Sequence, residues 1–224
     1  MEYKIIRSRR KTLSISVKDA EVTVHAPKSM PSIVIEEFVR SKSKWIESHQ
    51  VNQKARKKLR DNFCISYGDT ILYLGKTLTI EKGDVKRYNQ IEQRIILPPN
   101  LDSVAIKKII TKFYKDRAKE IITGKVKIYS EKMALKPSNV RITGARTRWG
   151  SCSGKANVNL SWYLVMASEE DIDYVVIHEL SHLKEMNHSE KFWTLVGKYV
   201  PDYKERRSSL RRLNERLLVE NWKQ

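Results

Sequence analysis

Apolar and polar residues alternate over the first thirty positions of the chain, and this pattern predicts short strands with one buried face. The strands are expected in YKIIRS (residues 3–8), TLSISVK (12–18) and AEVTVHAP (20–27). From residue 29 the apolar residues recur every three or four positions, as Ile35, Val39 and Ile46 do. This spacing predicts a helix that continues to about residue 60.

Strand patterns return in the middle of the chain, where Gly75 marks a hairpin turn. The segments are FCISYG (63–68), TILYLGKTLTIEKG (70–83) and QIEQRIILPPN (90–100). A long helical pattern then runs from Asn100 to Ala134, and Gly124 either breaks it or only weakens it.

The last third of the chain predicts two strands followed by helices. The strands are SNVRITG (138–144) and ANVNLSW (156–162). Ser168 precedes three acidic residues, which is a helix-capping signature, and further helices are expected near Ser189 and after Pro201. We therefore predict an α+β fold. A β-rich domain with an inserted helix covers residues 1–100, and a second domain covers residues 101–224.

Length and composition describe a globular protein. The chain has 224 residues, of which 40% are hydrophobic, and it contains no run of about 18 apolar residues that would span a membrane. The N-terminal segment lacks the apolar stretch of a signal peptide, so we expect a cytoplasmic protein. The two cysteines, Cys64 and Cys152, form no metal-binding pair, and we expect each to be a small buried hydrophobic residue.

The charge is strongly basic, at +18, and residues 1–60 alone hold 15 Lys or Arg against 6 Asp or Glu. Such a surface attracts anions, including nucleic acids, nucleotides and acidic proteins. The alternative is a solvated basic face that only maintains solubility. Charge therefore indicates the sign of a partner and leaves its identity open.

The segment HELSHLKEMNH (178–188) has the spacing of a zinc-hydrolase helix. A helix turns about 100° per residue, so His178 and His182 lie on one face and can bind a single ion. Glu179 lies at the edge of that face, where it can act as a general base without binding the metal. A bound zinc ion would lower the pKa of a water molecule for attack on a carbonyl or phosphoryl group. The alternative is a pair of hydrogen-bonded structural histidines.

The third metal ligand is expected to be His188, six residues after His182. Related zinc motifs use a glycine for the turn between these positions, but Glu185 stands there in this chain. We expect Asn187 to make the turn in a left-handed conformation, with Ser189 capping the next helix. The competing ligands are Glu190 and Glu205, on the elements that follow.

Several segments resemble the YgjP-like metal-dependent hydrolases, a zincin family grouped with M48-type metallopeptidases and more distantly with SprT-like proteins. The segments are TRWGSCSGKANVNLSWYLVMA (147–167), DYVVIHELSHLKEMNHSEKFW (173–193), VPDYKERRSSLRR (200–212), RSRRKTLSISV (7–17) and VTVHAP (22–27). The resemblance implies a zincin-like catalytic domain, with His178, His182 and His188 as ligands and Glu179 as general base. It also implies one Zn²⁺ per chain, although manganese or nickel would suit three histidines too.

Two substrate classes remain open, because members of this family are also linked to hydrolysis of nucleoside triphosphates such as UTP. A peptide would lie along the ANVNLSW strand, where Asn157 and Asn159 are candidate contacts. Arg148, Tyr199 and Tyr203 are candidates to stabilise the oxyanion. A nucleotide would instead use arginine side chains, which suit phosphate oxygens. The candidates are Arg146, Arg148, Arg206, Arg207, Arg211 and Arg212, together with Lys155.

A third interpretation is a metallopeptidase that binds nucleic acid weakly through its basic N-terminal domain. No DNA-binding motif supports it, and the charge is its only basis. The arginines of the nucleotide interpretation have an alternative role as well, because Glu205, Glu215 and Glu220 are available to pair with them. The sequence leaves the oligomeric state open.

Overall fold

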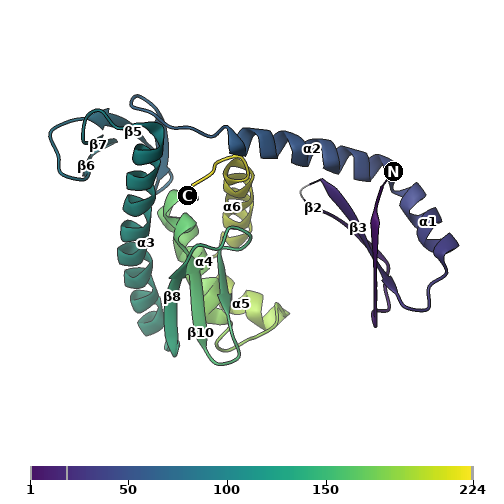
Figure 1. Cartoon of the computed structure of the whole chain (residues 1–224). Helices are drawn as coiled ribbons and strands as arrows, with labels where there is room; N and C mark the ends of the chain where they lie inside the picture. Colours follow the sequence, from purple (N-terminus) through teal and green to yellow (C-terminus); the bar gives the residue numbers. More distant parts are fainter. Residues whose placement is uncertain (1, 19, 223–224) are drawn as a thin grey trace. The chain divides into compact units, whose positions relative to one another are not determined.

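A computed structural model describes residues 2–18 and 20–222, which fall into two compact units (Figure 1). The N-terminal unit comprises the described residues up to Phe63 together with Leu217–Asn221. The second unit comprises Cys64–Arg216 together with Trp222. Strands and helices are both present in each part, which confirms the predicted α+β class. Within the described residues, no helix is both long enough and apolar enough to cross a membrane.

The N-terminal unit is a small sheet with two helices. Its elements are β1 (Lys4–Ser8), β2 (Ser14–Lys18), β3 (Glu21–Pro27), α1 (Ser32–Ser41) and α2 (Ser43–Asp61). β3 is the central strand, parallel to β1 and antiparallel to β2. All three strands lie where the alternating pattern predicts them.

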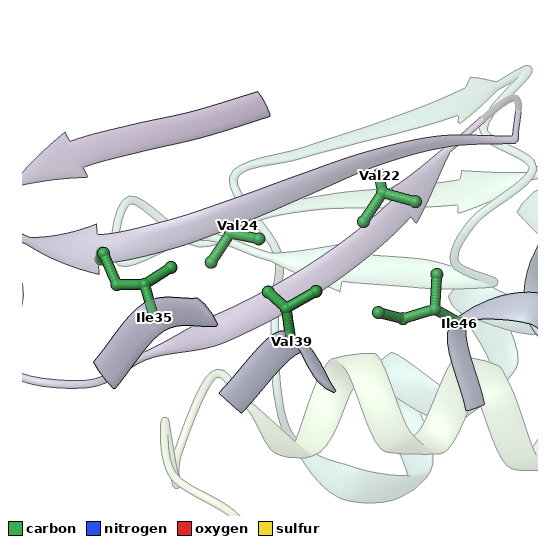
Figure 2. Packing of buried hydrophobic residues seen from close by; sticks show 6 residues of the cluster. Val22, Val24, Ile35, Val39 and Ile46 are labelled. Carbon is green, nitrogen blue, oxygen red and sulfur yellow. The ribbon is translucent and has the colours of Figure 1, made fainter. Parts of the chain in front are cut away.

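The core of this unit lies between β3 and the two helices (Figure 2). Val22 and Val24 alternate with more exposed residues along β3, as expected for a strand with one buried face. Ile35 and Val39 from α1 and Ile46 from α2 bury their side chains in the same cluster. The apolar positions of the predicted helix are therefore its packing face.

The predicted helix from residue 29 is in fact two helices. The backbone leaves helical geometry at Lys42, where φ is −104° and ψ is 8°. The Ser41 hydroxyl donates to the Phe38 carbonyl (2.8 Å), and the Lys42 N–H bonds to the same carbonyl (3.2 Å). A serine that bonds back to the preceding turn weakens helix continuation, which explains the break.

The second unit contains the remaining strands and helices. Its elements are β4 (Thr70–Tyr73), β5 (Lys76–Lys82), β6 (Asn89–Ile91), β7 (Arg94–Leu97), α3 (Ser103–Met133), β8 (Asn139–Thr143), β9 (Gly150–Cys152), β10 (Asn157–Ser161), the 3₁₀ helix η1 (Trp162–Met166), α4 (Glu169–Ser181), α5 (Glu190–Tyr199) and α6 (Tyr203–Leu217). One sheet has the order β4-β5-β7-β6 and the other the order β8-β10-β9.

The division between the units falls at residue 63, whereas the sequence placed it near residue 100. The β4–β5 hairpin explains the difference, because it is bonded to later parts of the chain. The Leu74 N–H donates to the carbonyl of Val165 in η1 (2.8 Å), and the Tyr73 ring lies 5.1 Å from the Phe113 ring in α3. The middle strands therefore belong to the same unit as the histidine-bearing helix.

Two further predictions from the sequence, a strand at residues 63–68 and a possible helix break at Gly124, concern this unit. FCISYG forms no strand: the buried Ile65 is held in irregular backbone by a hydrogen bond from its N–H to the Ser103 hydroxyl (2.9 Å). Gly124 does not break α3, because it lies on the exposed side of a helix that continues to Met133. Asp102 caps that helix by accepting from the Ala105 N–H (2.7 Å).

The N-terminal core gives a prediction of stability. Ile35→Ala should lower the unfolding free energy of this unit by about 2–5 kcal/mol, because it leaves a cavity in a fully buried site. The matched control is Ile33→Ala on the same helix, where the side chain is 63% exposed, with an expected change within about 0.5 kcal/mol. Native-state hydrogen exchange of the β3 amides in the whole chain measures both. Equal effects from the two variants would contradict the packing described here.

Candidate metal centre

Helix α4 carries the first two histidines and begins where the sequence predicts. Ser168 is its cap and accepts from the Asp171 N–H (3.2 Å). Ile172, Val176 and Leu180 bury one side of the helix in the core of the second unit. This apolar anchoring fixes the rotation of the helix, so His178 and Glu179 have defined directions.

Three imidazoles meet at one point. The metal-binding atoms of His178, His182 and His188 lie within 4.8 Å of one another, and the Nε2 atoms of His178 and His188 are 3.1 Å apart. The Phe192 ring contacts all three, with centroids 4.9, 4.5 and 4.8 Å away. In the part of the chain that the structure describes, neither Glu190 nor Glu205 joins this group.

The outer nitrogens of the imidazoles have their own partners. His178 Nδ1 is 3.4 Å from the Tyr174 hydroxyl, and His182 Nδ1 is 3.1 Å from the Glu185 carbonyl. With a proton on each Nδ1, the Nε2 atoms are free to bind a metal, which is the usual arrangement around ligating histidines. The donor set therefore fits a divalent metal such as zinc.

Burial favours the metal-binding form of the two histidines on and after α4. The pKa of His178 is lowered to about 3, chiefly by burial and also by the neighbouring His182 and His188. The pKa of His182 is also lowered, chiefly by burial. Neutral imidazole is the ligand form, so this environment favours metal binding.

The chain turns between His182 and His188 without a left-handed residue. Helix α4 ends at Ser181, and the N–H groups of Lys184 and Glu185 bond back to the Ser181 carbonyl (3.1 and 2.9 Å). The expected left-handed Asn187 is not found: its φ is not positive, and its carbonyl instead accepts from the Ser189 N–H (2.8 Å). Ser189 caps α5 as expected, through the Phe192 N–H (3.5 Å).

Glu179 is almost completely buried, with 5% of its surface exposed. Burial raises its pKa to about 7, and Arg148 opposes this shift. A positively charged metal nearby would lower the value again. The side chain lies directly against β9: a Cβ atom at Gly150 would be 2.6 Å from both Cγ and Oε1 of Glu179. Only glycine fits at position 150 while the carboxylate keeps this position.

A cavity of about 350 Å³ opens beside the metal centre. Its lining comes from the β9 segment, α4 and α6. The residues are Thr147, Arg148, Trp149, Gly150, Tyr174, Val175, His178, Glu179, Arg207, Leu210, Arg211 and Asn214. Arg148, Arg207 and Arg211 are therefore the candidate substrate-binding residues that lie in this cavity.

Five of the other predicted substrate contacts do not line the cavity, and each of the five has another partner. Asn157 and Asn159 donate to the hydroxyls of Ser153 and Ser151 (3.4 and 3.3 Å), which ties β10 to β9. Tyr203 stacks on Trp193, with centroids 5.0 Å apart.

Two arginines are also directed elsewhere. The Arg206 guanidinium bonds to Asp202 (2.6 Å) and lies 3.6 Å from Asp171. Arg146 lies over the Tyr163 ring, 5.9 Å from its centroid. Tyr199, an oxyanion candidate, donates to the Lys132 carbonyl (3.3 Å) and does not line the cavity. Arg148, Arg207 and Arg211, which line the cavity, form none of the ion pairs found among the described residues.

Sequence reasoning missed several cavity residues. Gly150 and Tyr174 are the important ones, since Gly150 lies against Glu179 and the Tyr174 hydroxyl contacts His178. Tyr174 could be found from its position one helical turn before His178. No local pattern marks Gly150, because its requirement comes from a residue 29 positions later in the chain.

Comparison with known proteins places this site in a family. The model of the YgjP-like metallopeptidase domain matches residues 11–213. The chain belongs to the YgjP-like family. Its domain is therefore of a metallopeptidase type, and this family implies a divalent metal, for which the three histidines provide ligands.

The chain was also compared with solved structures and with curated proteins. The chain is similar to the crystal structure of the metallopeptidase zymogen abylysin of Pyrococcus abyssi, with 25% identity and a TM-score of 0.30. That match covers 50% of this chain and 97% of abylysin. No match was found among curated proteins.

The ligand assignment can be tested directly. His188→Ala should lower the zinc content well below the expected value of about one per chain, because a His₃ site loses a third of its donors. Glu190→Ala is the matched control, two residues away on α5, and should leave the content unchanged. Zinc is measured by elemental analysis after dialysis against a weak chelator. If only the Glu190 variant lost metal, the third ligand would be the glutamate.

Proposed function

We propose that this chain is a zinc-dependent peptidase in which His178, His182 and His188 hold one zinc ion and Glu179 is the general base. The observation that carries the proposal is the buried Glu179 carboxylate, which packs against Gly150 and lines the same cavity as His178 of the three-histidine cluster. When bound, zinc would lower the pKa of a water molecule and polarise the carbonyl under attack.

Glu179 has the properties of a proton acceptor. Its carboxylate is buried and lines the cavity, where it can reach a water molecule beside the histidines. Because Gly150 has no side chain, the carboxylate can occupy this position against β9. Glu179 can take the proton from the attacking water and then transfer it to the leaving amine.

The substrate strand is proposed to bind along β9 and not along ANVNLSW. ANVNLSW contains β10, which lies between β8 and β9, so both of its edges are already paired. β9 is at the edge of that sheet. Trp149 and Ser153 bond to β10 through their carbonyl (2.8 Å) and N–H (3.0 Å), respectively.

The alternation of an antiparallel ladder then places the backbone groups of Gly150 and Cys152 on the free edge of β9. Glu179 packs against Gly150 at the same place. An extended peptide that adds to this edge would therefore pass beside the general base. This arrangement supports cleavage within a chain.

Tyr174 and Arg148 are suited to stabilise the developing oxyanion. Burial raises the pKa of Tyr174 to about 12, so its hydroxyl keeps its proton. If His178 Nδ1 donates to the hydroxyl oxygen, the phenol proton can point to the substrate. Arg148 lines the same cavity and supplies positive charge.

Hydrolysis of a nucleoside triphosphate is the second candidate function. Arg148, Arg207 and Arg211 line the cavity beside the histidines, and Lys204 lines a neighbouring hollow with Arg207 and Arg211. The Arg207 guanidinium is held over the Trp193 ring, 5.0 Å from its centroid. Guanidinium groups at fixed positions suit phosphate oxygens, which is the observation in favour of this alternative.

The two functions are separated by one experiment. Zinc-loaded protein is incubated with an unfolded protein and, in parallel, with nucleoside triphosphates, and Glu179→Gln is the blank. We expect new peptide termini that are absent from the blank, although the variant keeps its zinc. Pyrophosphate release without peptide cleavage would favour the nucleotide alternative. Equal activity in the variant would remove Glu179 from the mechanism.

The contact between Gly150 and Glu179 makes a second prediction. Gly150→Ala should lower kcat on the order of 10²-fold, because its Cβ displaces the carboxylate while the histidines stay in place. Gly154→Ala is the matched control, since nothing lies within 4 Å of a Cβ at that position. Peptidase rate and zinc content are measured for both variants. Loss of zinc from Gly150→Ala would show that the glycine supports the metal and not the base.

A further inference from the structure

A second, larger groove lies in the same unit and shares no lining residue with the metal cavity. Its volume is about 1120 Å³. It is bounded by the segment before β6, the outer face of α3, the end of β8 and the start of η1. The cationic residues on its lining are Lys86, Arg87, Lys108, Lys112, Lys115 and Lys119.

Four of these lysines form a continuous stripe on α3. Positions 108, 112, 115 and 119 are separated by four, three and four residues, so they lie on one face of the helix. At 1.5 Å per residue the stripe is about 16 Å long. All four side chains belong to exposed residues. The stripe therefore presents a row of positive charges to one side of the groove.

One acidic residue lines the groove, and it is already occupied. Asp116 pairs with Lys112 (2.5 Å) and accepts from the Tyr88 hydroxyl (3.3 Å). Among the described residues, no carboxylate forms an ion pair with Lys108, Lys115 or Lys119. These three charges are consequently available to an anionic ligand.

The rest of the groove is apolar. Ile109, Ile142 and Tyr88 are partly exposed and form its accessible walls. Trp162 lies at the floor and is only 5% exposed, with Gly144 above its indole nitrogen: a Cβ on Gly144 would be 3.4 Å from Nε1. The groove thus combines an apolar floor with a cationic rim.

We propose that this groove binds a segment of single-stranded nucleic acid. Phosphates would follow the lysine stripe of α3, and bases would lie against the apolar walls, which are the two features of sites for single strands. A strand carries charges at regular intervals along its length, which matches a stripe of regularly spaced lysines. The proposal concerns the second unit, and so differs from an interaction through the basic N-terminal segment.

Other anions match the groove less well. The triphosphate of one free nucleotide is shorter than the stripe and would leave lysines at one end without a partner. An acidic peptide could pair with the lysines, but its carboxylates would leave the apolar walls uncovered. Duplex nucleic acid presents its phosphates and hides its base faces, so the apolar walls would again be unused.

The test compares two variants of the whole chain that lose equal charge. In the first, Lys108, Lys115 and Lys119 are replaced by Gln; in the second, Lys54, Lys57 and Lys58 of α2 are replaced by Gln. Binding of a fluorescent twelve-nucleotide DNA strand is measured by anisotropy at several salt concentrations. The first variant should bind roughly tenfold or more weakly, with the salt slope reduced by about 2, whereas the second should change little.

Gly144→Leu supplies a charge-neutral arm, since it fills the groove above Trp162. This variant should weaken binding and leave the salt slope unchanged. Equal losses in the two lysine variants would overturn the proposal, because binding would then follow net charge alone. Tighter binding of polyglutamate, of the duplex or of a free nucleotide than of the single strand would overturn it as well.

Discussion

The structure of the site depends on bringing three imidazoles to one point. Two of them need only a helix, because His178 and His182 are one turn apart on α4. The third needs a corner and a second helix: His188 lies between a turn closed by the Asn187 carbonyl and the cap made by Ser189. Phe192 then packs against all three rings, so the apolar contact that starts α5 also holds the ligands together. Burial lowers the pKa of His178 and of His182, which favours the neutral form that binds a metal.

Glu179, the proposed general base, is positioned by a different contact. It lies against the backbone of β9, where the absence of a side chain at Gly150 leaves room for its carboxylate. The same short strand has a free edge. Under the proposed function, one three-residue segment therefore positions the base and offers backbone groups to an extended substrate. This double use explains how a strand of only three residues, Gly150–Cys152, can be important in the site.

Local patterns predicted the parts of this structure that depend on local physics. The spacing of His178 and His182 and the caps at Ser168 and Ser189 follow from helix geometry and unpaired backbone N–H groups, so the sequence alone indicated them. Gly150 and the role of β9 were missed, because a glycine, a serine and a cysteine carry no strand pattern and their partners are distant in sequence. The position of the boundary between the units is not visible in local patterns for the same reason. It depends on contacts between distant segments, such as the hydrogen bond from the Leu74 N–H to the Val165 carbonyl.

Helix α6 shows why counting arginines could not identify the substrate. Adjacent arginines have opposite roles there. Arg206 turns inward to Asp171, whose carboxylate also accepts from the Ser209 hydroxyl (2.6 Å), and these contacts anchor α6 to the start of α4. Arg207, one residue later, faces the metal cavity and rests on Trp193. The contacts of Arg206 and Ser209 with Asp171 hold α6 in place. The position of α6 in turn sets the direction of Arg207 and Arg211. The direction of Arg207 into the cavity thus depends on the contacts between α6 and α4, the helix that carries His178 and Glu179.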